Sequence, residues 1–338
     1  MSNNRSQTLL YPLRFEPICQ YRLWGGRRLE KMLTAPLPDG PIGEAWILSD
    51  RDDFASLVAN GPLKGQTIGH LLQLWPEQLM GKSAGYYSRF PLLMKFLDAR
   101  DMLSVQVHPS DRQKKYLPAG EHGKTEAWVV LEAGTESRIY SGLKSGTTAE
   151  NLWQALKNGN VADQLEYFTP KPGDSVFIPT GTVHALGGDI VVFEVQQNSD
   201  VTFRLYDWNH IDTKTGQPRE LQVEQAIACI DFGQALAGPV TPVVEEVKPV
   251  LRESLILCEH FKLWRICGES PFKVGAAGMP RVLVCIDGKG QLDYNGDNYV
   301  VRKGDVWLLP AMVGACAFRP LNKVNLLEVA LPEWLLSE

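Results

Sequence analysis

The stretch Lys171-Pro172-Gly173-Asp174-Ser175-Val176-Phe177-Ile178-Pro179 joins a turn signal to a short apolar run that ends at a proline. Gly-Asp after a proline is typical of a tight turn, and a proline ends a strand because it cannot donate a ladder hydrogen bond. The pattern recurs in Val301-Arg302-Lys303-Gly304-Asp305-Val306-Trp307-Leu308-Leu309-Pro310, where Gly-Asp is again followed by four residues and a proline. This internal repeat of turn and strand predicts two copies of one β-rich unit.

Short apolar runs separated by glycine and proline make up most of the chain between these copies and before them. We expect strands at 92–97, 103–107, 127–131, 175–178, 190–196 and 201–205. Apolar residues near helical period predict helices at 67–79, 148–164 and 220–230. Many short strands with few helices are typical of an antiparallel barrel or jelly roll, so the predicted fold class is mainly β.

The length of 338 residues is enough for two domains of ordinary size. The segment 235–250 holds three prolines and no clear period, which favours a linker. We therefore predict one domain at 1–235 with helical excursions, a linker at 236–250 and a smaller β domain at 251–338.

Four side chains of metal-ligand type lie in or near these predicted strands. Gln106 and His108 alternate with two valines, so on a strand they would share one face. Glu126 adds a carboxylate, and His184 adds a second imidazole five residues after the first repeat's proline. Such an N/N/O/O set suits a divalent first-row metal in a water-accessible site. The second copy has Ala315 where the first has His184, so we expect one metal-bearing barrel and one degenerate barrel.

Bulk composition excludes several other classes of protein. A net charge of −5 argues against a nucleic-acid-binding surface, and no stretch reaches the length of a membrane helix. Residues 1–10 contain no apolar run of signal-peptide length. The six cysteines form no C-x-x-C pair and are expected to be reduced thiols, which favours the cytoplasm. Phosphate-binding loops, nucleophile elbows and dinucleotide fingerprints are absent from the sequence.

The spacing from Gly173 through Pro179 and Gly181 to His184 resembles the second motif of the cupins. The first cupin motif fits poorly, because Gln106 replaces a histidine and Glu126 lies 18 residues beyond His108. In this departure the chain resembles the type I mannose-6-phosphate isomerases, whose metal ligands include Gln and His of a Q-V-H-P segment. Further segments that look like that family, in its short bacterial form, are 24–26, 43–46, 49–50, 90–95, 123–126 and 198–204.

The resemblance implies a metal-dependent aldose–ketose isomerase that interconverts mannose 6-phosphate and fructose 6-phosphate through a cis-enediolate. It implies zinc, ligated by Gln106, His108, Glu126 and His184, although manganese, iron or cobalt would serve by ligand type alone. The alternatives are an isomerase of another phosphosugar and a non-catalytic sugar-binding or regulatory cupin. A monomer or homodimer that binds a small phosphosugar is expected.

Five charged residues complete the predicted site. Lys124, two residues before Glu126, would face the metal from a strand and suit acid–base work, as would Glu194 and Asp200. Arg204 could hold a phosphate or stabilise an oxyanion, and Lys95 could be a second anion contact. The alternative for Lys124 is a solvated surface position, for Arg204 a surface ion pair, and for Lys95 a side chain that reaches solvent from a strand end.

Overall fold

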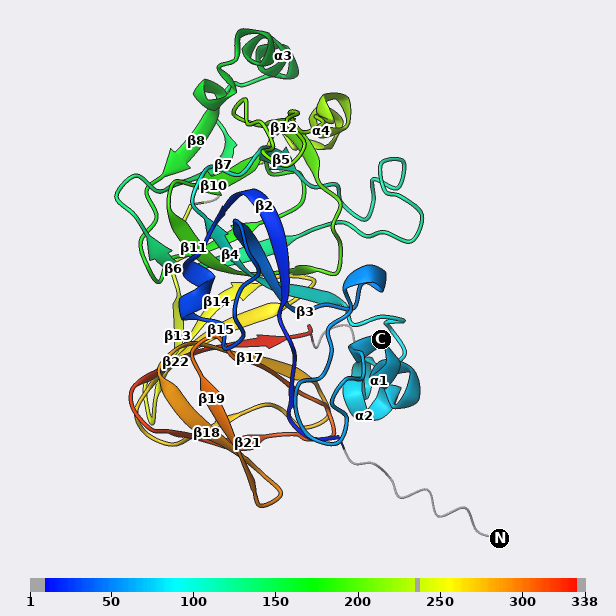
Figure 1. Ribbon diagram of the computed structural model, residues 1–338, viewed down its shortest axis with the longest axis vertical. Coiled ribbons are helices and arrows are strands. Elements are labelled where there is room, and N and C mark those ends of the chain that lie inside the picture. The colour runs from blue at the N-terminus through cyan, green and yellow to red at the C-terminus, as the bar shows by residue number, and fades with distance from the viewer. Residues whose placement is uncertain (1–9, 235–237, 333–338) are drawn as a thin grey trace. The chain divides into compact units, whose positions relative to one another are not determined.

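The structure is a computed structural model that describes residues 10–234 and 238–332 (Figure 1). Residues 1–9, and residues 236–237 of the predicted linker, lie outside the described residues. The chain is mainly β, as the spacing of apolar runs predicted. It divides into a central unit, residues 17–54, 91–234 and 238–241, and a C-terminal unit, residues 10–16, 55–90 and 242–332.

The central unit is built from two antiparallel sheets. One has six strands in the order β2 (Ile18–Gly26), β3 (Ile42–Leu48), β4 (Leu92–Ala99), β11 (Ile190–Gln197), β6 (Glu126–Ala133) and β9 (Ser175–Ile178). The other has five, in the order β12 (Phe203–Tyr206), β5 (Val105–Val107), β10 (His184–Gly187), β7 (Arg138–Leu143) and β8 (Leu165–Phe168). Two sheets of this kind form the cupin-like jelly roll that was predicted.

The five-stranded sheet is covered on its outer face by two helices. Val105 and Val107 of β5 pack in one buried cluster with residues of α3 (Ala149–Asn158) and α4 (Val223–Cys229), which Figure 1 shows beside this sheet. Thr148 caps α3 and Gly159 ends it, followed by the 3-10 turn η4 (Val161–Gln164). The predicted helix at 148–164 therefore exists but is shorter. Further 3-10 turns of this unit are η1 (Arg28–Lys31) and η2 (Asp52–Phe54).

The C-terminal unit repeats the plan of two sheets. Its seven-stranded sheet has the order β1 (Leu13–Arg14), β20 (Val306–Leu309), β17 (Arg281–Asp287), β22 (Val324–Ala330), β15 (Lys262–Gly268), β14 (Leu251–Leu257) and β13 (Val243–Glu246). Its four-stranded sheet has the order β16 (Phe272–Val274), β21 (Cys316–Pro320), β18 (Lys289–Tyr294) and β19 (Asp297–Arg302). Side chains from both sheets, among them Leu283, Leu292 and Phe318, form one buried core.

The division differs from the predicted domain boundaries in two places. Residues 10–16 and 55–90 pack with the C-terminal unit, because β1 pairs with β20 and the backbone of Gln78 and Leu79 accepts hydrogen bonds from residues 311–312. These contacts join segments far apart in sequence, so no local pattern reveals them. The predicted linker also contains β13, an edge strand that pairs with β14.

The predicted helix at 67–79 is broken in the middle. It consists of α1 (Ile68–Leu74) and α2 (Pro76–Met80), followed by the 3-10 turn η3 (Gly81–Ser83). Pro76 has no N–H to continue α1, and it instead occupies the first turn of α2.

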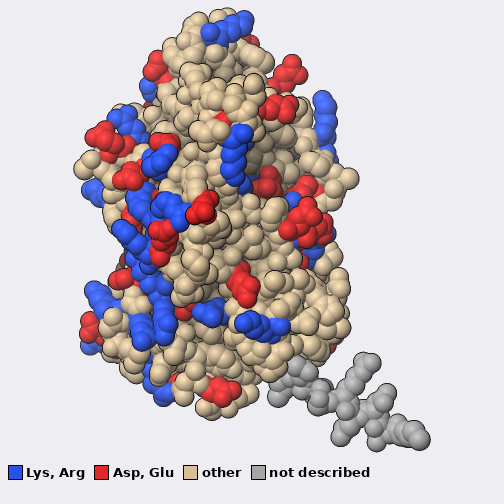
Figure 2. Space-filling view, in the orientation of Figure 1, with Lys and Arg blue, Asp and Glu red and all other residues tan. Residues whose placement is uncertain are grey.

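Among the described residues, no helix is both long and apolar enough to cross a membrane. On the face shown in Figure 2, Lys and Arg side chains lie among Asp and Glu side chains.

The repeated turn has the same geometry in both units. Gly173 and Gly304 have φ of 95° and 87°, a region that residues with a Cβ rarely adopt. The carboxylates of Asp174 and Asp305 each accept a 2.8 Å hydrogen bond from the backbone N–H three residues before. The strands that follow, β9 and β20, begin one residue after each aspartate. The internal repeat therefore specifies a turn that positions one strand in each unit.

We expect Gly304→Ala to destabilise the C-terminal unit by about 1–2 kcal/mol, because the added Cβ is strained at this positive φ. Gly85→Ala is a matched control, since a Cβ there meets nothing within 4 Å and the backbone needs no positive φ. Urea denaturation followed by tryptophan fluorescence measures both. An unchanged midpoint for Gly304→Ala would contradict the role given to this turn.

Candidate metal centre and its cavity

The inward face of the six-stranded sheet changes from apolar to ionisable along its strands. Leu97 of β4 and Val192 of β11 belong to the buried core of the central unit. Two residues further toward one end, the same face carries Lys95 and Glu194, which lie directly opposite each other across the strands. Trp128 of β6 lies opposite Glu194 on its other side, which makes one continuous row. Strand alternation therefore brings charged groups together where the apolar core ends.

A second row crosses the five-stranded sheet. Arg204 of β12 lies opposite Gln106 of β5, and Gln106 lies opposite His184 of β10. These three residues come from segments almost 100 positions apart, and the register of three strands makes them neighbours. The row also explains why Val105 and Val107 face the helices instead, because side chains alternate along β5.

Three side chains of metal-ligand type converge between these rows. One ligand atom each from His108, Glu126 and His184 lies within 4.8 Å of the others. The Nε2 atom of His108 is 3.4 Å from Glu126 Oε2, and that of His184 is 3.3 Å from Glu126 Oε1. All three side chains are buried. Within residues 10–234 and 238–332 this is the one group of three or more His, Cys, Asp or Glu side chains with such spacing.

Hydrogen bonds to the backbone fix the orientation of both imidazoles. The Nδ1 atom of His108 is 2.9 Å from the carbonyl of Val201, and that of His184 is 2.9 Å from the carbonyl of Thr182. A carbonyl only accepts, so each Nδ1 carries the proton and each Nε2 presents a lone pair to Glu126. Burial, with the charge of Lys124, lowers the pKa of His108 to about 3, and burial also lowers the pKa of His184. Both rings are therefore neutral, as ligands must be.

Gln106 lies next to this group. Its amide nitrogen is 3.1 Å from His184 Nε2, and its amide oxygen accepts a 3.3 Å hydrogen bond from Ser104. Since amide nitrogen and oxygen are nearly equal in size, a half-turn of the amide would present the oxygen to the same point. Gln106 could therefore supply a fourth ligand.

The carboxylate of Glu126 is the observation that tests whether a metal fits. The side chain is fully buried, and neither oxygen has a hydrogen-bond donor with good geometry among the described residues. The nearest positive charge is Lys124 Nζ, 3.0 Å from Oε2. Burial opposes the charge of Glu126, but the charge of Lys124 holds the pKa of Glu126 well below the usual range. A buried anion with two neutral imidazoles beside it fits a divalent cation.

A cavity of about 420 Å³ opens beside this group. Its lining includes all five charged residues that the sequence singled out: Lys95, Lys124, Glu194, Asp200 and Arg204. Gln106 and Ser104 line it as well. The structure therefore brings the predicted charged residues and the metal-ligand group to one place in the central unit.

The surroundings of these residues differ from expectation in some details. Lys124 lies before β6 rather than on it, yet its Nζ is buried and 3.3 Å from His108 Nε2. Burial opposes its charge, but Glu126, Glu194 and Asp200 raise its pKa. Lys95 lies within β4 instead of at its end and is 3% exposed, so it does not reach solvent. Its Nζ is 3.2 Å from Glu194 Oε1, while Trp128 Nε1 donates to Glu194 Oε2 at 2.9 Å.

Arg204 lies in the cavity wall rather than in a surface ion pair. Its Nη1 donates a 2.7 Å hydrogen bond to the carbonyl of Glu220, which fixes the guanidinium group. Its Nε is buried and has no partner among the described residues. Burial and the neighbouring Arg219 lower the pKa of Arg204. Because Arg204 lines the cavity, an anionic acceptor bound there would suit its guanidinium group.

Three further lining residues were missed by sequence reasoning. Arg22 of β2 makes two 3.0 Å contacts with the carboxylate of Glu44 on β3. Burial opposes that charge, but Arg22 and Lys95 hold the pKa of Glu44 at about 2. Arg219 donates a 2.8 Å hydrogen bond from Nε to Asp207. Glu44 stands in a quoted family segment, but the pairing of β2 with β3 was needed to find Arg22, and no sequence signal indicated Arg219.

The known proteins that are similar to this chain share one described activity. A model of the family "Phosphomannose isomerase type I, catalytic domain" matches residues 13–127. The mannose-6-phosphate isomerase ManA of Bacillus subtilis is 36% identical over 308 residues, which are 90% of this chain and 94% of that protein. The mannose-6-phosphate isomerase of Streptococcus mutans is 35% identical over 309 residues, which are 91% and 95% of the two chains.

A solved structure agrees with these sequence matches. The crystal structure of a mannose 6-phosphate isomerase from Bacillus subtilis is similar with a TM-score of 0.87 at 28% identity, over 95% of this chain and 100% of that chain. The likeness extends through both units, and the buried His–Glu–His group lies in the part of the chain that these relatives match. The chain therefore belongs to the type I mannose-6-phosphate isomerase family.

Proposed function

We propose that this chain interconverts mannose 6-phosphate and fructose 6-phosphate. The observation that carries the proposal is the buried, unbonded carboxylate of Glu126 between two neutral imidazoles, at a cavity whose wall holds three arginines and two lysines. These five cations outnumber the four carboxylates of the same lining, Glu44, Glu194, Asp200 and Asp212, and suit a phosphorylated and oxygen-rich substrate. Zinc as the metal, the cytoplasm as the location, and a monomer or homodimer as the assembly stay predictions.

The metal would be held by Gln106, His108, Glu126 and His184. When bound, a divalent cation supplies positive charge that favours anionic oxygen on the substrate, because a single carboxylate ligand leaves about one charge uncompensated. The carbonyls of Val201 and Thr182 keep both imidazoles in the ligating tautomer. Zinc accepts this N/N/O/O set, as other first-row divalent ions do.

The arginines of the cavity would bind and orient the substrate. Arg204 offers a buried N–H without an acceptor among the described residues, and the backbone carbonyl of Glu220 accepts a hydrogen bond from its Nη1. An oxyanion of an enediolate, or a phosphate oxygen, would accept from this N–H. Arg22 and Arg219 already donate hydrogen bonds to Glu44 and Asp207. They would therefore contribute positive charge to the cavity rather than free hydrogen-bond donors for the substrate.

The proton that moves between C1 and C2 of the open-chain sugar needs an acid–base group. Three side chains that line the cavity are candidates: Lys124, Glu194 and Asp200. Burial raises the pKa of Glu194 above its usual range, which moves a carboxylate toward the value that suits proton transfer near neutral pH. Trp128 and Lys95 fix its orientation. We therefore favour Glu194 for the proton transfer, with Lys124 and Asp200 as the alternatives.

We expect one divalent metal per chain, and we expect chelation to abolish isomerisation until zinc is added back. His108→Ala and His184→Ala should lose both metal and activity, because each removes one ligand. His122→Ala is the matched control in the same unit, since this exposed side chain lies outside the group. Elemental analysis and a coupled mannose 6-phosphate assay measure both properties. Full activity in metal-free protein would refute the metal's role.

Arg204→Ala should lower turnover about 10²–10³-fold, the usual effect of losing one preorganised charge stabiliser. Arg204→Lys should restore little, since a point charge cannot reproduce the planar fork. Metal content should stay the same in both variants. Arg100→Ala is the control, because Arg100 forms an exposed pair with Asp101 in the same unit. Steady-state kinetics decide, and a near wild-type rate for Arg204→Ala would sink this assignment.

The acid–base group can be separated from its neighbours by isotope exchange. Glu194→Gln should lower both turnover and the incorporation of solvent deuterium into the product, while metal content is retained. Asp200→Asn and Lys124→Met should retain more exchange than Glu194→Gln if Glu194 moves the proton. Mass spectrometry of the product measures the label. If Glu194→Gln exchanges deuterium normally and one of the other variants does not, the proton transfer belongs to that other residue.

A further inference from the structure

The C-terminal unit contains its own cavity, of about 720 Å³, which lies within the range of small-molecule sites. All of its lining residues belong to that unit, whereas the cavity beside the metal-ligand group is lined by the central unit alone. It lies at the end of the β18–β19 hairpin, next to the start of β20 and to β1. The second unit therefore offers a separate place for a ligand.

Aromatic side chains form one wall of this cavity. On the inward face of the hairpin, Leu292 and Val301 belong to the buried core, and Tyr294 and Tyr299 pack against that core. Tyr299 lies edge-on to Trp307 of β20, with ring centroids 5.6 Å apart. The wall thus presents broad apolar faces at the point where the core ends.

Trp307 carries an unused hydrogen-bond donor. The residue is 4% exposed and lines the cavity, yet its Nε1 has no acceptor among the described residues. Buried indole N–H groups usually find a partner, and leaving one unpaired costs free energy. An oxygen of a bound ligand would satisfy it.

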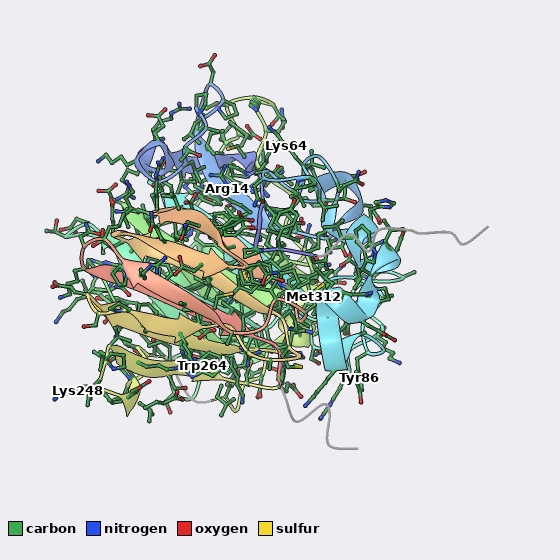
Figure 3. The ribbon with its side chains drawn as sticks, turned by 90° about the horizontal axis from the view of Figure 1, so that it is seen from below. Arg14, Lys64, Tyr86, Lys248, Trp264 and Met312 are labelled. Carbon is green, nitrogen blue, oxygen red and sulfur yellow. The ribbon has the colours of Figure 1, made fainter. Side chains whose placement is uncertain are left out.

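Charged side chains surround this wall in equal numbers of each sign. Arg14, which lies opposite Trp307 in register and is labelled in Figure 3, and Arg302 supply two positive charges. Asp297 and Asp305 supply two negative charges. Arg14 Nη1 is 3.5 Å from Asp305 Oδ1, a weak contact that leaves donors for a ligand. Balanced charge favours a neutral ligand over a phosphorylated one.

We propose that the C-terminal unit binds a neutral saccharide in this cavity. A sugar ring has an apolar C–H face, which matches the rings of Tyr294 and Tyr299, and a rim of hydroxyl groups that both donate and accept. The indole N–H of Trp307, the guanidinium of Arg14 and the carboxylate of Asp297 provide the complementary groups. The site is independent of the isomerase chemistry, since it shares no lining residue with the metal-bearing cavity.

Saturation-transfer NMR and calorimetry on the full zinc-loaded chain test the proposal. The probes are the neutral disaccharides mannobiose, cellobiose and maltose at millimolar concentration, with mannose 6-phosphate and adenosine as charged and planar comparators. At least one disaccharide should bind, and Tyr299→Ala should weaken it about tenfold or more by removing one ring of the wall. Trp307→Phe, which keeps a ring but removes the N–H, should also weaken it.

Three controls locate the binding. Tyr86→Ala removes an exposed tyrosine of the same unit, which Figure 3 shows well away from Arg14, and should leave saccharide binding unchanged. His184→Ala should also leave it unchanged, and Tyr299→Ala should retain full isomerase activity. The proposal is overturned if no disaccharide binds, if binding is lost in His184→Ala but not in Tyr299→Ala, or if Tyr299→Ala affects only mannose 6-phosphate or adenosine.

Discussion

The burial of the Glu126 carboxylate is the constraint on which the site depends. An ionised carboxylate without hydrogen bonds is costly inside a protein, and here the nearest group that offsets the cost is the ammonium of Lys124, 3.0 Å from Glu126 Oε2. Each imidazole is held by a backbone carbonyl so that its lone pair points at the carboxylate. Two lone pairs and a carboxylate that point at one another suit a divalent cation between them, which is the basis of the proposed metal site.

The two rows of side chains show how a β-barrel provides such a point. Along β4 and β11 the inward positions are apolar in the core, at Leu97 and Val192, and ionisable toward one end, at Lys95 and Glu194. Cross-strand register then decides which charged groups meet, as with Lys95 and Glu194 or with Arg204 and Gln106. The same plan in the C-terminal unit places Trp307 and Arg14 side by side. One duplicated architecture thus forms two cavities with different chemistry.

Sequence alone predicted what local spacing can encode. Because side chains alternate along a strand, the sequence placed Gln106 on the face opposite Val105 and Val107. The repeated Gly-Asp turn predicted the strands β9 and β20. Register is not local, so neither the pairing of Arg22 with Glu44 nor that of Lys95 with Glu194 was predicted. The contact of residues 55–90 with the C-terminal unit was missed for the same reason. Local sequence patterns therefore predict candidate ligands and turns, whereas the partners of a side chain on neighbouring strands are known only once the fold is known.

Anomalous X-ray diffraction from crystals of the zinc-loaded chain, recorded on both sides of the zinc absorption edge, tests the central claim most directly. The account predicts one strong peak about 2.0–2.2 Å from the Nε2 atoms of His108 and His184, a carboxylate oxygen of Glu126 and the amide oxygen of Gln106. A peak elsewhere, or none within reach of Glu126, would contradict it.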